Sequence, residues 1–102
     1  MRRVVLSRTY VAQLRTLLEH GAAVFGASVA EQTLIRIDHV IENHLAHFPK
    51  KPIDETLGLR VFAILRTPFV LIYDFDENEL RIHFIIPMRT DRRSIDSMSA
   101  EW

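Results

Sequence analysis

Apolar positions along this chain follow two different periods, and the change between them falls at Gly58. From residue 8 to residue 47, apolar side chains recur every three or four positions, which is the period of an amphipathic helix. Beyond residue 58 they alternate with polar residues or form short continuous runs, which is typical of strands. The pattern predicts a helical N-terminal part followed by a sheet.

Two helices are expected in the first part, over Arg8–Phe25 and Ser28–His47. Ser7 is suited to cap the first helix, because its hydroxyl can accept a hydrogen bond from a free N–H of the first turn. The first residue of the second helix is also a serine, and Glu31 three positions later completes the pattern of a capping box. The link of two residues, beginning at Gly26, predicts an antiparallel helix hairpin.

Four strands are expected, and they are separated by residues that favour turns: Arg3–Leu6, Leu59–Arg66, Phe69–Phe75 and Leu80–Ile86. The last three are joined by short connections, which predicts an antiparallel meander. Simple alternation in the last strand places Leu80, Ile82, Phe84 and Ile86 on one face and Arg81, His83 and Ile85 on the other.

The order β-α-α-β-β-β predicts an α+β fold, with the helix hairpin packed on a mainly antiparallel sheet. One domain is expected over residues 1–93, followed by a polar C-terminal tail over residues 94–102. The residues from Asp91 onward are polar enough to form a loose tail.

Composition narrows the class of protein. The 102 residues carry 13 basic and 13 acidic side chains and contain no cysteine, which excludes disulfides, thiolate zinc sites and cysteine nucleophiles. Zero net charge disfavours bulk nucleic-acid binding, in which phosphate contacts supply most of the affinity. No stretch is long and apolar enough for a signal peptide or a membrane span, so a cytoplasmic protein with no membrane contact is expected.

Arginines are the first candidates for a binding site. Arg60 and Arg66 share a face of one expected strand, and Arg81 shares a face of another with His83. If these faces point away from the helices, they line one surface whose guanidinium groups suit phosphate or carboxylate. The alternative is that these arginines are solvated, or that Arg60 forms a structural ion pair with one of three acids: Asp54, Glu55 or Asp74.

Groups for acid–base chemistry are scarce. RNA cleavage needs a base, an acid and cations, and only His83 and Tyr73 lie near the arginines as acid–base candidates. Both also have ordinary interpretations, as a surface histidine and a core tyrosine. His44 and His47 have the i, i+3 spacing of two metal ligands but no evident third ligand. We therefore expect no metal and no cofactor.

Over residues 4–89 the chain resembles the RelE/ParE family of toxins from bacterial type II toxin–antitoxin modules. The resemblance is carried by the order and spacing of five segments: Val5-Leu6-Ser7 before a helix, Gly58-Leu59-Arg60, Pro68–Tyr73, Leu80–Ile85 and Arg89. Ribonuclease members of the family often have a His or Tyr just after the last strand, whereas this chain has Ile86-Pro87-Met88-Arg89 there. That departure and the neutral charge favour the ParE-like branch.

The resemblance implies a toxin that poisons DNA gyrase. Such a toxin acts by binding its target and is not itself an enzyme. One alternative is a RelE-type mRNA endonuclease, ribosome-dependent or free, whose catalytic residues would be Arg60, Arg81, His83 and Tyr73. A second alternative is a non-toxic binding module of the same fold. Sequence-specific binding of nucleic acid by this chain alone is not expected.

The resemblance also implies a cognate acidic antitoxin, whose flexible C-terminal part folds on the toxin. The residues expected to bind the antitoxin or the target are five arginines: Arg60, Arg81, Arg89, Arg92 and Arg93. Two sets of apolar residues are expected to leave surface for it, namely Val24, Val29 and Ala30 on the helices, and Phe62, Ile64 and Ile85 on the sheet away from the helices.

Overall fold

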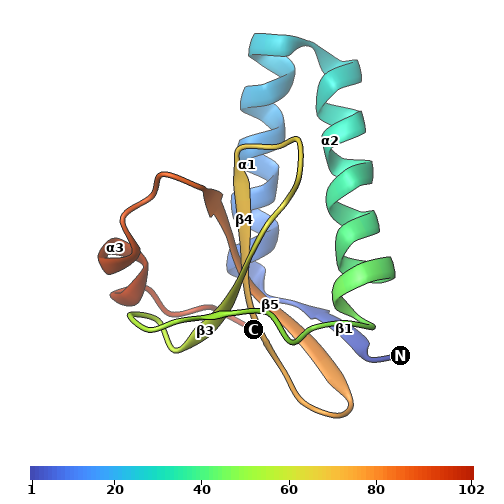
Figure 1. The fold of residues 1–102 in the computed structure, drawn as a ribbon. Helices are drawn as coiled ribbons and strands as arrows, with labels where there is room; N and C mark the ends of the chain where they lie inside the picture. The colour runs from blue at the N-terminus through green and yellow to red at the C-terminus, as the bar shows by residue number, and fades with distance from the viewer.

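A computed structural model describes residues 1–102 and consists of a helix hairpin packed on one face of a five-stranded sheet (Figure 1). In chain order the elements are β1 (Arg3–Leu6), α1 (Arg8–Phe25), α2 (Ala27–Val40), a π-helical turn η1 (Ile41–Leu45), β2 (Ile53–Asp54), β3 (Leu59–Ala63), β4 (Phe69–Phe75), β5 (Glu79–Pro87) and α3 (Arg92–Asp96). The predicted α+β architecture is confirmed. None of the helices is both long and apolar enough to cross a membrane.

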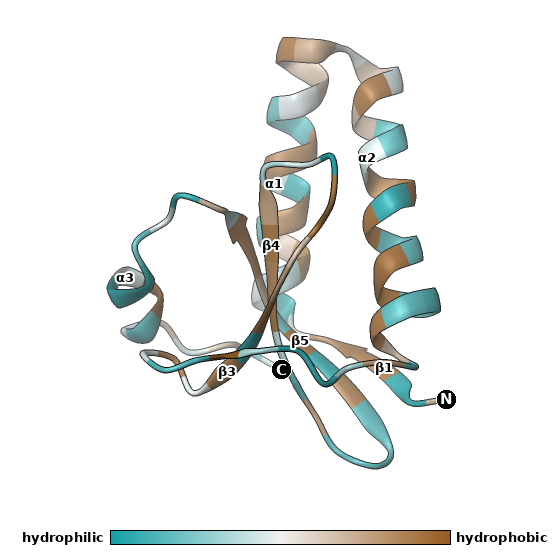
Figure 2. Cartoon of the chain, in the orientation of Figure 1, coloured by the Kyte–Doolittle hydropathy of each residue, from teal (hydrophilic) through white to brown (hydrophobic).

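The sheet has the strand order β1-β5-β4-β3-β2. β1 runs parallel to β5, and the other neighbouring pairs are antiparallel. β4 is apolar along most of its length and lies between the helix hairpin and the C-terminal segment (Figure 2). Four of its seven residues, Val70–Tyr73, are buried, as expected for a strand covered on both faces.

The helices begin differently from one another. The Oγ atom of Ser7 accepts a hydrogen bond from the N–H of Tyr10 at 2.8 Å, which confirms the predicted cap. The predicted cap at Ser28 is wrong, because α2 begins at Ala27 with Gly26 as its N-cap and has no side-chain cap. Gly26 has a φ of 99°, which glycine adopts readily, so the chain reverses at this residue and Ser28 already lies inside the helix.

The second helix does not remain α-helical to His47. From Ile41 to Leu45 it widens into a π-helical turn, in which the N–H of Ala46 donates to the carbonyl of Ile41. Both end residues of this turn are buried. The predicted strand Leu59–Arg66 is also too long: β3 ends at Ala63, and Arg66 lies in the following turn with a φ of 64°.

A β-bulge in β5 changes which side chains face the helices. Ile72 pairs with Phe84 and Tyr73 with Ile82, so His83 has no partner in β4. The predicted alternation is therefore wrong beyond the bulge. Leu80, Ile82 and Ile85 pack in the cluster beneath the helices, and Phe62 and Ile64 join them there. The expectation that Phe62, Ile64 and Ile85 face away from the helices is therefore wrong. Phe84 and Ile86 pack on the far side.

The C-terminal segment covers that far face. Ile95 of α3 is buried against Val70, Ile72, Phe84 and Ile86. Farther along, the carbonyl of Glu101 accepts a hydrogen bond from the N–H of Arg8, and its N–H donates to Thr9 Oγ1. The expectation of a loose tail is therefore wrong, because the side chain of Ile95 and two hydrogen bonds of the Glu101 main chain hold it to the body.

Candidate functional site

Arg81 is held in a network of carboxylates. Its Nε lies 2.8 Å from Asp74 Oδ1, and its Nη1 lies 2.8 Å from Asp76 Oδ2 and 3.2 Å from Glu79 Oε1. Hydrogen bonds from Arg81 and from the N–H groups of the β4–β5 turn lower the pKa of Asp76 to about 2. The positive charge of Arg81 is thus neutralised within the chain.

Arg60 lies on the opposite face of the sheet from Arg81. Arg60 pairs with Tyr73 and Arg81 with Asp74, and successive residues of β4 point to opposite faces. The Nη1 of Arg60 donates to the carbonyl of Lys51 at 2.7 Å, and its guanidinium lies 5.1 Å from the centroid of the Phe75 ring. The structure does not bring the two arginines together on one surface.

The two acid–base candidates are also separated. Tyr73 is buried and its hydroxyl donates to the carbonyl of Pro49 at 2.8 Å; burial raises its pKa. His83 lies on the other face of the sheet, where its Nε2 is 3.4 Å from Asp74 Oδ1. Its ring packs edge-on against the Trp102 ring, with 4.8 Å between the ring centroids. The four residues expected of a nuclease therefore do not converge.

The three C-terminal arginines differ in whether they form an ion pair with a carboxylate. Arg92 Nε lies 3.4 Å from Asp54 Oδ2, and Arg93 Nη2 lies 3.1 Å from Asp91 Oδ2. Arg89 is exposed and forms no ion pair. Of these three, Arg89 alone presents an unneutralised charge.

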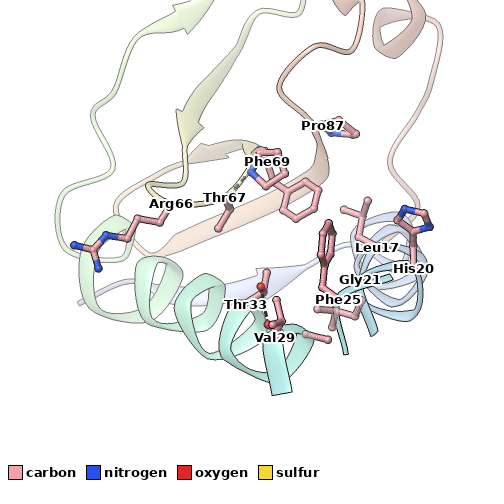
Figure 3. A pocket seen from close by; sticks show the side chains of 13 residues that line it. Leu17, His20, Gly21, Phe25, Val29, Thr33, Arg66, Thr67, Phe69 and Pro87 are labelled. Carbon is pink, nitrogen blue, oxygen red and sulfur yellow. Dashed lines mark hydrogen bonds between the residues drawn. The ribbon is translucent and has the colours of Figure 1, made fainter. Parts of the chain in front are cut away.

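An open apolar pocket lies where the upper part of the helix hairpin passes the β3–β4 turn. It encloses about 520 Å³, and its lining is mainly apolar: Leu17, Leu18, Phe25, Val29, Ala30, Phe69 and Pro87. The rings of Phe25 and Phe69 face this space, and Arg66 extends from its edge (Figure 3). Phe25 is 68% exposed, which is costly for a phenylalanine that has no partner.

Part of this pocket could be expected from the sequence. Val29 and Ala30 were expected to leave apolar surface, and both line the pocket. Phe25 and Phe69 were missed as pocket residues, because each falls on a regular apolar pattern that predicts core. The signal for Phe25 is its place as the last residue of α1, directly before the glycine that ends the helix.

Comparison with known proteins gives a structural match only. No family model and no curated protein matches the sequence. Among solved structures, the chain is similar to a chain described as "Chromosomal ParDE TA system from P. aeruginosa", with a TM-score of 0.71 and 20% sequence identity over 85% of this chain and 96% of that one. The chain therefore shares the fold of this ParDE chain, as the resemblance to the RelE/ParE family predicted.

Proposed function

We propose that this chain is the toxin of a type II toxin–antitoxin module and that a cognate antitoxin neutralises it in the cytoplasm. The observation that carries the proposal is the fold shared with the ParDE chain over 85% of the sequence. The open apolar pocket supports it, because a protein made together with a dedicated partner has a reason to keep such a surface.

The pocket suits an amphipathic segment of the antitoxin. Its walls are two helices and a strand turn, which is the geometry that accepts an apolar side chain from a helix laid in a groove. Arg66 at its edge forms no ion pair and can meet an acidic residue next to that side chain.

For the target, we propose DNA gyrase rather than messenger RNA. The dispersal of Arg60, Arg81, His83 and Tyr73 over two faces supports this choice, since general acid–base catalysis requires its groups within reach of one phosphate. Neutralisation of Arg81 by three carboxylates further weakens a nuclease site.

Regulated production in a bacterial host tests the target. We expect growth arrest with double-strand DNA breaks and intact transcripts. Transcript cleavage at defined sites would favour the endonuclease instead, and normal growth would favour a non-toxic binding module.

Neutralisation tests the pocket separately. Co-production of the acidic protein encoded next to this chain is expected to restore growth. Val29→Glu places a charge at the pocket and is expected to abolish that rescue while toxicity remains. Ile35→Glu is the matched control, because Ile35 lies on the same helix, is 61% exposed and does not line the pocket. Equal rescue of both variants would remove the pocket from the antitoxin interface.

A further inference from the structure

Four basic residues gather at the end of the molecule where the second helix runs into β2. Arg2, Lys50 and Lys51 line a depression of about 420 Å³, and Arg60 adjoins it through its hydrogen bond to the Lys51 carbonyl. None of the four forms an ion pair, whereas Arg81 on the opposite face contacts three carboxylates. A chain of zero net charge thus has one concentrated, unneutralised positive surface.

Three of the four cations of this surface are held in place, namely Arg2, Arg60 and Lys51. The Nε of Arg2 donates to the carbonyl of Asp76 at 2.6 Å, and the guanidinium groups of Arg2 and Arg60 both lie about 5 Å from the centroid of the Phe75 ring. Each guanidinium uses one donor, so the other N–H groups remain for an anion. The ammonium of Lys51 lies 5.3 Å from the Phe62 ring centroid.

A buried tyrosine fixes the loop that carries the lysines. Tyr73 donates to the carbonyl of Pro49, the residue just before Lys50. Phe48, on the other side of Pro49, is 63% exposed and lines the same depression. The loop therefore presents an open aromatic ring beside two ammonium groups.

We propose that this surface binds single-stranded nucleic acid without sequence preference. Its cations would contact successive phosphates, and Phe48 would stack on an unpaired base; a positive groove with an exposed aromatic ring is the combination that such binding uses. A duplex has no free base face for Phe48, and a purely acidic peptide would leave the ring uncovered. This surface is separate from the apolar pocket, so the proposal holds or fails independently of the proposed function.

Fluorescence anisotropy with labelled oligouridine and oligothymidine, each about 10 nucleotides long, tests the proposal. The wild-type chain is expected to bind at low salt, with log K falling against log salt at a slope of about −2 to −3, as three to four phosphate contacts on a single strand require. Phe48→Ala is expected to weaken binding by at least about fivefold. The two probes show whether the surface distinguishes RNA from DNA, since they differ in the 2′-hydroxyl and in the methyl group of the base.

A charge-matched pair of variants provides the control. Lys50→Glu with Lys51→Glu is expected to abolish binding, whereas Arg15→Glu with Arg36→Glu, on exposed helix positions, changes the net charge equally and is expected to retain most of it. Thermal melts confirm that each variant is folded. The proposal is overturned if neither probe binds, if both double variants lose binding equally, or if polyglutamate binds as tightly and Phe48→Ala has no effect.

Discussion

Replacing Ser7 with alanine tests how the first helix is joined to the sheet. Ser7 is fully buried, and its Oγ makes two hydrogen bonds: it accepts from the N–H of Tyr10 at 2.8 Å and donates to the carbonyl of His83 at 2.6 Å. His83 is the bulge residue with no partner in β4, and its carbonyl accepts the hydrogen bond of the Ser7 hydroxyl. One hydroxyl therefore caps α1 and also donates a hydrogen bond to the carbonyl of the bulge residue.

The expected loss can be worked out from these two bonds. Removing an N-cap hydroxyl costs about 1 kcal/mol, and leaving the partly buried His83 carbonyl without this donor costs about 1–3 kcal/mol. Ser7→Ala should therefore lower the free energy of unfolding by about 2–4 kcal/mol, a large share of the 5–15 kcal/mol typical of a domain. Urea unfolding followed by circular dichroism measures the difference.

Ser28→Ala is the matched control for this measurement. Both serines stand at predicted helix starts, but Ser28 is exposed and makes no capping bond, so its replacement should cost less than about 0.5 kcal/mol. If the two variants unfold at the same urea concentration, or if Ser7→Ala costs under about 0.5 kcal/mol, the double role of Ser7 is refuted.

Three further outcomes are expected. Ile37→Ala, at a fully buried core position, should cost about 2–5 kcal/mol in the same assay, and a loss below about 0.5 kcal/mol would contradict its core position. The pKa of Asp76 is lowered from 3.8 to about 2, so stability should be lost as pH falls between these values, and Arg81→Met should flatten that loss in pH-dependent melts; an equally steep loss would refute it. Ile95→Ser should release the C-terminal segment and shift the fluorescence of Trp102, the single tryptophan, to the red; an unchanged spectrum at intact helix content would contradict the packing of that segment.

The sequence predicts the element order well because each element has a strong period. The helix hairpin and the three-stranded meander follow from spacings of 3.6 and 2, and glycine and proline mark their ends. The bulge could not be predicted in this way. His83 is polar and stands between Ile82 and Phe84, so the pattern there is a regular alternation although the pairing with β4 skips a residue.

The candidate site could be predicted less well than the fold. Charged residues were identified by type, but their partners depend on how the chain folds. The turn at Asp76 brings three carboxylates to Arg81. The pairing of Arg60 with Tyr73 and of Arg81 with Asp74 places the two arginines on opposite faces of the sheet. The basic surface at Lys50 and Lys51 has no signal in the local sequence, because their surroundings come from Arg2 and Phe75 at distant positions of the sequence.

The parallel pairing of β1 with β5 has a consequence for how the protein forms during translation. Arg3 pairs with Glu79, so the first strand has no partner until more than three-quarters of the chain has left the ribosome. Contacts between residues so far apart in sequence form late. Until then the nascent helix hairpin exposes the apolar stripe that later covers the sheet, and the emerging chain offers chaperones a target before any folded surface exists.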